Sequence, residues 1–245
     1  MNSVRLTIDA GNSAIKAGLW QQGSLLAFEV MPATDIVRLK AFTAPYSVAS
    51  AIFCSVRAVN TDFLEAVNSE IAPLTVLSAS TPVPLANAYA TPATLGMDRL
   101  AAAVGAAAIA PGRPLLVADL GTAATYDHVS ADGTFLGGNI APGIRMRLDA
   151  LASGTAQLPQ LDTPPAPFRP ANMFGSSTRE AMLNGAVLGV VAELAYYRAL
   201  SGPETMTVIT GGDARLVAPL IDFPCVTDDH LVGRGLNCIS LYNEK

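Results

Sequence analysis

The sequence predicts an α/β protein made of two similar domains, and two observations lead to this fold class. Short apolar runs with strand-like composition alternate with longer runs of helical character, which is typical of sheets flanked by helices. In addition, one pattern occurs twice: a strand that ends in D-x-G-[N/T], then a second strand, a hairpin and a third strand. The leading aspartates of the two copies, Asp9 and Asp119, lie 110 positions apart (119 minus 9). Because solenoid repeats are shorter, this repeat indicates two related domains, which we place at residues 1–110 and 111–245.

The composition fits this size and excludes several classes of protein. The 245 residues are 51% hydrophobic and 14% charged, which is more apolar than a fully solvated monomer needs, so a buried dimer interface is one explanation. The net charge of -5 argues against a general nucleic-acid or anionic-membrane binder. The longest apolar run, at 100–110, is far shorter than the roughly 20 residues of a membrane span. The N-terminus lacks the features of a signal peptide, so we expect a cytoplasmic protein.

Turn signals and apolar runs predict the elements of the first half in order. The β-rich run at 4–8 ends in the turn signal Asp9-Ala10-Gly11-Asn12, and a hairpin loop at 21–24 joins the next two strands. The Ala-rich helix at the end of this half is stopped by Pro111-Gly112. The expected elements are strands at 4–8, 15–20 and 25–30, a helix at 35–42, a strand at 46–56, a helix at 62–71, a strand at 74–78 and a helix at 97–110.

The pattern then restarts in the second half. Ser177-x-x-Glu180 is a capping box that opens a long helix, and this helix is apolar around most of its circumference. We therefore expect it to be buried, with a subunit contact as one option. The expected elements are strands at 115–118, 125–129 and 134–140, a proline-rich surface loop at 157–170, a helix from 177 to about 200, a strand at 206–210, a helix after 211–213 and a closing helix at 229–242.

The two D-x-G-[N/T] turns are the first candidates for a binding site. A glycine after the aspartate lets backbone N–H groups approach an anion without a Cβ in the way, and the following amide or hydroxyl can bond phosphate oxygens. Lys16 can reach the same phosphates as a point charge. The alternative is that each segment is a plain turn between strands. This alternative is less favoured because the two turns occupy matching positions in the repeat. The double glycine Gly211-Gly212 lies at a strand-to-helix junction and allows an adenosine to bind close to the backbone. The alternative is that it forms a simple strand-to-helix turn.

One further segment places an acid and a base side by side. Tyr89 and Pro92 precede Gly96-Met97-Asp98-Arg99, which opens a helix. Asp98 can orient an attacking hydroxyl and accept its proton, and Arg99 can hold an anionic group of a substrate. Alternatively, Asp98 is a helix-N-terminal acid that the dipole favours, and Arg99 is a surface charge.

With this segment, the sequence resembles a type III pantothenate kinase from end to end. The matching segments in order are 9–16, 96–99, 119–127, 137–143, 155–159, 177–182 and 210–213. This family belongs to the sugar kinase, Hsp70 and actin superfamily, in which ATP binds in a cleft between two domains. The resemblance therefore implies two ribonuclease-H-like domains with mixed sheets flanked by helices, and an ATP cleft between them. It also implies the phosphorylation of pantothenate to 4'-phosphopantothenate, the first step of coenzyme A biosynthesis.

The resemblance also implies roles for individual residues. Asp98 would be the catalytic proton acceptor, and Asp119 would bind the monovalent cation (K+ or NH4+) that the family requires, while Mg2+ would accompany ATP. The chain would form a homodimer and bind neither nucleic acid nor membrane. The implied ATP contacts, in addition to Gly211 and Gly212, are Asp9, Ala10, Gly11, Asn12, Ser13, Ala14, Ile15, Lys16 and Thr122. The implied pantothenate contacts are Tyr89, Gly96, Met97, Asp98, Arg99 and Thr178.

Three alternative functions stay open at this point. Another kinase of the superfamily, acting on a sugar or a carboxylate, would share the phosphate turns but not Gly96-Met97-Asp98-Arg99. A non-catalytic accessory factor related to the family would not need Asp9, Asp98 and Asp119. An actin-like filament protein would hydrolyse ATP without pantothenate and would assemble into polymers.

Overall fold

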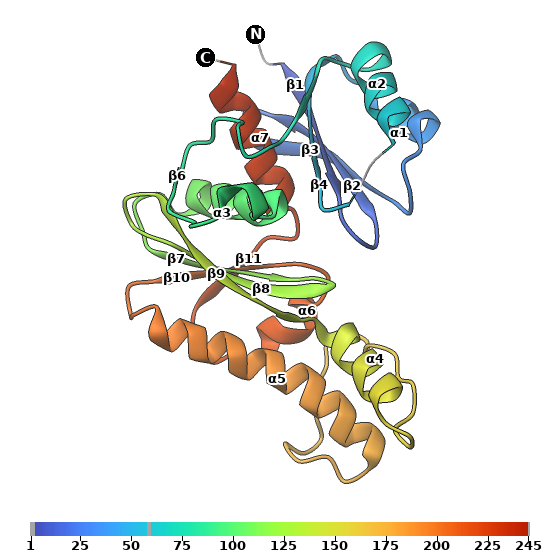
Figure 1. Ribbon diagram of the computed structural model, residues 1–245, viewed down its shortest axis with the longest axis vertical. Helices are drawn as coiled ribbons and strands as arrows, with labels where there is room; N and C mark the ends of the chain where they lie inside the picture. The colour runs from blue at the N-terminus through green and yellow to red at the C-terminus, as the bar shows by residue number, and fades with distance from the viewer. Residues whose placement is uncertain (1–2, 58–59, 245) are drawn as a thin grey trace. The chain divides into compact units, whose positions relative to one another are not determined.

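The computed structural model describes residues 3–57 and 60–244, and Figure 1 shows its helices and strands. The chain forms two compact units. Unit 1 contains the residues up to Pro111, the short segment Gly133–Phe135 and the residues from His230 onward, and unit 2 contains Gly112–Asp132 and Leu136–Asp229. Each unit is built on a mixed sheet flanked by helices, so the predicted α/β class is confirmed.

Unit 1 is built around a five-stranded sheet with the order β3-β2-β1-β4-β5. Strand β1 is antiparallel to β2 and parallel to β4. The predicted hairpin loop between β2 and β3 is a tight turn in which Gln22 and Gly23 both have positive φ, as two-residue hairpins require. The elements are β1 (Val4–Ala10), β2 (Ile15–Gln21), β3 (Ser24–Met31), α1 (Ile36–Thr43), β4 (Val48–Ser55), α2 (Thr61–Glu70), β5 (Leu74–Val76), β6 (Ala86–Asn87), the 3-10 helix η1 (Pro92–Thr94), α3 (Met97–Ile109) and α7 (Leu231–Asn243).

The two faces of this sheet differ in character because side chains alternate along each strand. Leu6, Ile8 and Ala10 of β1 point into an apolar core that also contains Leu39 of α1 and Phe63 of α2. The alternate β1 residues Arg5, Thr7 and Asp9 are polar, although they are also buried. Helices α3 and α7 pack on β4, and α7 also packs on β1 (Figure 1).

Helices α3 and α7 pack with their backbones in direct contact. A Cβ on Gly235 of α7 would lie 1.8 Å from the carbonyl oxygen of Ala101, and a Cβ on Gly105 of α3 would lie 2.4 Å from the carbonyl oxygen of Leu231. Both distances are far below a possible contact, so only glycine fits at these two positions. The small side chains of the Ala-rich helix α3 therefore allow α3 and α7 to pack closely.

Unit 2 is built around the strand order β11-β10-β7-β8-β9. One face of the sheet packs on α4, α5 and α6 in a single core, in which Tyr126 of β8 meets Val187 and Leu194 of α5 (Figure 1). The elements are β7 (Leu115–Leu120), β8 (Ala123–Val129), β9 (Thr134–Pro142), α4 (Ile144–Gly154), α5 (Thr178–Leu200), β10 (Met206–Thr210), α6 (Ala214–Val217), the 3-10 helix η2 (Ala218–Leu220) and β11 (Cys225–Thr227). The first residues of β9 belong to unit 1, where they pair with β6.

The structure differs from the sequence-based prediction in three places. Helix α4 was not predicted, although Ile144 and Leu148 bury one side of it as in an ordinary amphipathic helix. The short strands β6 and β11 were also missed, because two or three residues carry no periodic signal. Finally, we placed residues 230–245 in the C-terminal domain, whereas the described part of this segment groups with unit 1 because α7 packs on α3 and β1.

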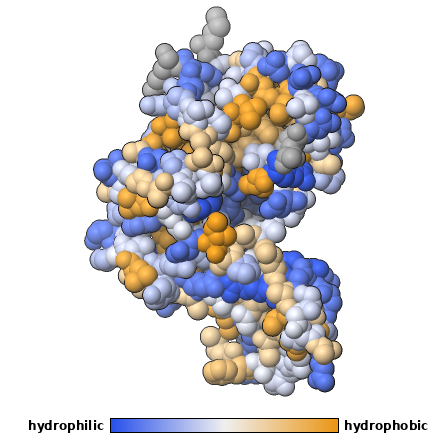
Figure 2. Space-filling model, viewed as in Figure 1, coloured by the Kyte–Doolittle hydropathy of each residue, from blue (hydrophilic) through white to orange (hydrophobic). Residues whose placement is uncertain are grey.

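Hydrophobic groups are scattered among hydrophilic ones on the surface in view in Figure 2. Among the described residues, no helix combines the length and the apolar character needed to cross a membrane. The described cysteines are Cys54, Cys225 and Cys238, all of which are free thiols.

An ion pair between a buried arginine and an exposed glutamate ties α7 to the sheet of unit 1. Arg5 of β1 donates from Nε to Oε1 of Glu244 at 2.8 Å and from Nη2 to Oε2, and the Ser50 hydroxyl donates to Oε1 at 2.9 Å. The Arg5 hydrogen bonds hold the pKa of Glu244 below its ordinary value of 4.5. The carboxylate thereby pairs with an arginine that is almost completely buried on the α7 side of β1.

We expect Glu244→Gln to lower the free energy of unfolding by about 1 kcal/mol at pH 7, after allowance for the partial exposure of the carboxylate. Because the pKa is lowered in the folded state, this contribution is fully present above pH 4.5 and is lost as the pH falls through the folded-state pKa. Urea unfolding at pH 7 and at pH 3 measures the difference. The control is Glu65→Gln on an exposed position of α2. An equal effect of both substitutions at pH 7 would contradict the expectation.

Candidate functional site

The first predicted phosphate turn, between β1 and β2, is a tight loop in unit 1. The backbone N–H of Gly11 donates to the carbonyl oxygen of Ala14 at 3.0 Å and closes the turn. Asn12 and Ser13 at its tip are exposed. Ala10 and Ile15 at its base are completely buried, so the exposed tip stands on a rigid part of the sheet.

Three chemically important side chains lie in a row across the sheet beside this turn. Asp9 of β1 is paired with Lys16 of β2 on one side and with Cys54 of β4 on the other. Because residues paired in this way project from the same face, the carboxylate, the ammonium group and the thiol share the face that α7 and α3 cover. The strand positions therefore place a positive and a negative group next to the turn.

The first turn of α3 brings a second carboxylate to unit 1. Gly96 is the N-cap of α3, and Oδ1 of Asp98 accepts a hydrogen bond from the backbone N–H of Arg99 at 2.9 Å. A Cβ on Gly96 would lie 2.6 Å from this oxygen, so the glycine leaves room for the carboxylate. Met97 is the first residue of the helix.

The charges of Asp9 and Asp98 both act on the Cys54 thiol. Burial raises the pKa of this thiol well above its ordinary value, and the negative charges of Asp9 and then of Asp98 raise it further. The carboxylates from β1 and α3, far apart in the sequence, therefore act on one buried sulfur. Two carboxylates and Lys16 in such an arrangement can orient a hydroxyl group and a phosphorylated ligand.

Arg99, the next residue of α3, lies beside two neighbouring aromatic rings. Its guanidinium carbon is 5.6 Å from the ring centre of Tyr89 and 5.9 Å from that of Phe135, distances that suit cation–π interactions. The two rings are 6.1 Å apart. The structure thus brings the predicted residues Tyr89, Asp98 and Arg99 together in unit 1. Phe135 was missed, because the sequence predicts only that it lies on a strand and does not show that the strand pairs with β6.

The second predicted phosphate turn, between β7 and β8, lies in unit 2. Its residue Gly121 donates from the backbone N–H to the carbonyl oxygen of Ala123 at 3.1 Å. The N–H of Gly143, the N-cap of α4, donates to the carbonyl oxygen of Thr122 at 3.2 Å. A Cβ on Gly143 would lie 2.3 Å from the carbonyl oxygen of Gly121. The turn is thus held from behind by the start of α4.

The predicted adenosine turn packs on the same segment. Gly211 has a φ of +95°, and a Cβ on it would lie 2.4 Å from the carbonyl of Leu120 and 2.6 Å from Oδ1 of Asp119. The N–H of Asp213 donates to the carbonyl oxygen of Leu120 at 2.9 Å. Gly212 is exposed and has open space around its Cα. The structure therefore brings Asp119, Thr122, Gly211 and Gly212 together in unit 2.

Burial and a hydrogen bond from a helix N-terminus have opposite effects on the pKa of Asp213. Burial raises the pKa of its carboxyl group, while a hydrogen bond from the backbone of Ile144 lowers it. Ile144 is the first residue of α4. Asp213 therefore links the adenosine turn to the same helix end that supports the phosphate turn.

The surroundings of Asp119 suit a hard cation. Its carboxylate occupies space between Gly121 and Gly211 that a Cβ on Gly211 would fill, and its donor atoms are oxygens, which K+ and Mg2+ prefer. The described part of the chain has no cluster of three or more His, Cys, Asp or Glu side chains that could hold a metal. The space at the Asp119 carboxylate fits one oxygen ligand of a cation.

The predicted contact Thr178 lies in unit 2, as the first, exposed residue of α5. Ser177 is the N-cap, and its side chain accepts from the N–H of Glu180 at 3.3 Å, as the capping box predicts. The Glu180 carboxylate accepts from the N–H of Ser176 instead of Ser177. The Thr178 hydroxyl is thus not the group that caps the helix.

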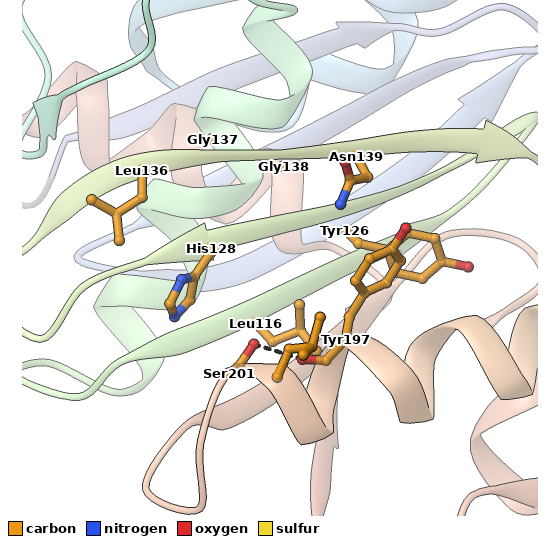
Figure 3. Close-up of a pocket in the computed structure, with 10 residues that line it drawn as sticks. Leu116, Tyr126, His128, Leu136, Gly137, Gly138, Asn139, Tyr197 and Ser201 are labelled. Atoms are coloured by element: carbon orange, nitrogen blue, oxygen red, sulfur yellow. Dashed lines mark hydrogen bonds between the residues drawn. The ribbon is translucent and has the colours of Figure 1, made fainter.

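Unit 2 also contains a cavity of about 300 Å³ between the sheet and the C-terminal end of α5 (Figure 3). His128, Leu136 and Leu200 are among the residues that line it. Burial lowers the pKa of His128, so its ring is neutral at pH 7. None of the site residues predicted from the sequence lines this cavity, which therefore lies outside the candidate site.

The amino-acid sequence matches a known protein family and several of its members. A family model described as type III pantothenate kinase matches residues 5–199. A type III pantothenate kinase of Porphyromonas gingivalis strain W83 is 38% identical over 246 residues, covering 98% of this chain and 99% of that protein. Another, from Phocaeicola vulgatus, is 36% identical over 245 residues and covers 99% of this chain and 100% of that protein.

A solved structure from Sinorhizobium meliloti, described as a 2-dehydro-3-deoxygalactonokinase, is similar in fold. It has a TM-score of 0.58 and 15% identity, with coverage of 98% of this chain and 99% of that chain. At this identity the likeness concerns the fold alone, and it agrees with the predicted sugar kinase and actin-like architecture.

We expect Gly211→Ala to lower the free energy of unfolding by on the order of 3 kcal/mol, because alanine is strained at positive φ and its Cβ would overlap with the Leu120 backbone. Gly212→Ala is the matched control, since open space surrounds that residue, and its effect should stay within about 0.5 kcal/mol. Urea unfolding of both variants measures the difference. If the Gly211→Ala and Gly212→Ala variants were equally stable, the close contact described at Gly211 would be contradicted.

Proposed function

The chain belongs to the type III pantothenate kinase family, and from this premise we propose that Asp98 accepts the proton of the pantothenate hydroxyl. The protein is a kinase that transfers a phosphoryl group from ATP to an alcohol, namely the ATP-dependent phosphorylation of pantothenate in coenzyme A biosynthesis. The product is 4'-phosphopantothenate, and the reaction is the first step of that biosynthesis. The observation that carries the assignment of Asp98 is its place in the first turn of α3, next to Arg99, where its charge and that of Asp9 both act on Cys54.

Phosphoryl transfer needs little covalent help from the protein, because its transition state is loose and its charge is spread over the phosphoryl oxygens. The main tasks are to hold the reactants in line and to neutralise charge. Asp98 therefore orients the primary hydroxyl group and takes its proton late in the step.

We assign ATP contacts in each unit separately. In unit 1 the turn from Asp9 to Ile15 offers backbone N–H groups, and Lys16 offers a positive charge to the phosphates. In unit 2 Thr122 offers a hydroxyl group, and Gly211 and Gly212 leave the backbone open to adenosine. Magnesium, when bound with ATP, neutralises phosphate charge. The described residues support this assignment because the tips of both turns are exposed and their bases are held by backbone hydrogen bonds.

We assign the pantothenate contacts on the same basis. The Arg99 guanidinium holds the carboxylate of pantothenate, since it is the cationic group adjacent to Asp98. Tyr89 lines the site beside Arg99, and the backbone at Gly96 and Met97 contacts the substrate. Thr178, in unit 2, contributes its exposed hydroxyl group.

Asp119 is proposed to bind the monovalent cation, K+ or NH4+. The glycines at 121 and 211 leave space at its carboxylate, and a weakly hydrated cation can add backbone carbonyls to its oxygen ligands. The cation would neutralise charge next to the second phosphate turn. We also propose that the enzyme works in the cytoplasm, because its phosphoryl donor is ATP.

We further propose a homodimer that forms through unit 2. Helix α5 buries Met182, Leu183, Ala186, Val187, Val190 and Leu194 inside the unit, which explains part of its apolar circumference. However, Tyr196 and Leu200 at its C-terminal end are exposed, and Leu200 lines the cavity of Figure 3 together with the exposed Leu136. An apolar surface around a cavity is suited to a protein contact. The proposed dimer binds neither nucleic acid nor membrane, in keeping with the net charge of -5.

Light scattering should give twice the chain mass of 25.3 kDa for the wild-type protein at micromolar concentration. Leu200→Glu places a charge in the proposed interface and should shift the mass towards 25.3 kDa. Val37→Glu is the control, because Val37 is 75% exposed on α1 in unit 1, compared with 67% for Leu200. A wild-type monomer, or a dimer that Leu200→Glu leaves intact, would argue against this interface.

A coupled ADP-release assay, with and without pantothenate and with K+ exchanged for Na+, tests the function. We expect pantothenate-dependent ADP release that K+ increases. Asp98→Asn should lower kcat by about 100-fold or more while ATP binding is retained, since a general base contributes about 10²–10⁴-fold. Asp62→Asn, the same change in the first turn of α2, is the matched control and should keep the wild-type rate.

Two results would contradict these proposals. If ADP release did not depend on pantothenate, the assigned reaction would be wrong. If Asp98→Asn turned over at nearly the wild-type rate, Asp98 would have no part in proton transfer.

A further inference from the structure

We infer that Phe135 is a positioning residue for pantothenate binding, which acts by holding the guanidinium group of Arg99 against Tyr89. This inference rests on the proposed role of Arg99 in binding the substrate carboxylate. Phe135 is fully buried, with 0% of its surface exposed, and Arg99 is 6% exposed. The guanidinium carbon lies within 6 Å of both ring centres, at 5.6 Å for Tyr89 and 5.9 Å for Phe135.

The pairing of β6 with β9 brings the two rings to the same place. Asn87 is the register partner of Phe135, and the N–H of Ala88 donates to the carbonyl oxygen of Phe135 at 2.9 Å. The side chain of Asn87 also accepts from the N–H of Tyr89 at 2.9 Å. The backbone of Phe135 therefore holds the segment that carries Tyr89, while its ring faces Arg99.

This arrangement restricts the guanidinium in a way that charge alone would not. An arginine side chain has many rotamers, and its planar head is weakly hydrated and stacks well on aromatic faces. Contact with both rings restricts the orientation of the head, so the plane in which it can meet a planar carboxylate is defined. Loss of one ring removes a cation–π partner and allows the head to rotate.

The expected consequence is selectivity for an acceptor that carries a carboxylate. A charge-assisted pair between Arg99 and a carboxylate is stronger than a hydrogen bond to a neutral hydroxyl group, and it depends more on the orientation of the guanidinium. Phe135 should therefore contribute to the binding of pantothenate more than to that of pantothenyl alcohol, in which a CH2OH group replaces the carboxylate. ATP binding does not involve Arg99 in our assignment and should not change.

The test compares the kcat/KM values for pantothenate and for pantothenyl alcohol in the ADP-release assay. We expect Phe135→Leu to raise the KM for pantothenate roughly tenfold and to lower the ratio of the two kcat/KM values by a similar factor, with the KM for ATP unchanged. Phe135→Met fills more of the ring volume without a π face, and it takes the place of Phe135→Leu if that variant does not fold.

The control for a merely structural role is Phe63→Leu. Phe63 is also buried in unit 1, and its ring contacts Phe53 at 6.5 Å. This variant should lose stability but keep the ratio of the two substrates. If it lowered the ratio as much as Phe135→Leu, general destabilisation would account for the effect and the inference would be overturned.

Arg99→Lys separates the inference from the function on which it rests. This variant keeps the positive charge and loses the planar head, so it should lower the same ratio. If Arg99→Lys left the ratio and the KM for pantothenate unchanged, Arg99 would not bind the substrate carboxylate. The positioning role of Phe135 would then be overturned as well. If Arg99→Lys lowered the ratio but both Phe135 variants kept it, only the positioning role of Phe135 would be overturned.

Discussion

The contact between the backbones of α3 and α7 is the constraint on which the site in unit 1 depends. With Gly235 against the Ala101 carbonyl and Gly105 against the Leu231 carbonyl, the backbones of the two helices meet directly at these two points. Helix α7 in turn packs on β1, so the direction of α3 follows from the sheet. The first turn of α3 carries Asp98, and its position relative to Asp9 is thereby set by glycines far from either carboxylate.

The same face of the sheet explains why unit 1 can accommodate these polar groups. Arg5, Thr7 and Asp9 alternate along β1 and are all buried, which is costly unless each group has partners. Arg5 pairs with Glu244, and Thr7 accepts a hydrogen bond from Nε1 of Trp20 at 2.9 Å. Asp9 stands at the end of this row, next to the turn. The polar face thus leads from a structural ion pair at one end to the proposed reaction centre at the other.

The two phosphate turns share a sequence pattern but are supported in different ways. The turn in unit 1 is closed by its own hydrogen bond from Gly11 to Ala14. The turn in unit 2 is also held from outside by Gly143 and Gly211, each of which fits only because it lacks a Cβ. A cation proposed at Asp119 would therefore lie in a rigid setting made of backbone from three separate segments.

The sequence alone was sufficient for the α/β class, the repeated strand–turn–strand pattern and most helix and strand positions, because alternation and caps such as Ser177 are local signals. It also predicted that Asp98 and Arg99 belong to a site, because an acid, a base and a glycine stand side by side at a helix start. Contacts between distant segments were not predictable in this way. The association of α7 with unit 1, the approach of Asp98 to Cys54 and the ring of Phe135 beside Arg99 were decided by tertiary packing, since each depends on shape at a point where residues far apart in the chain meet.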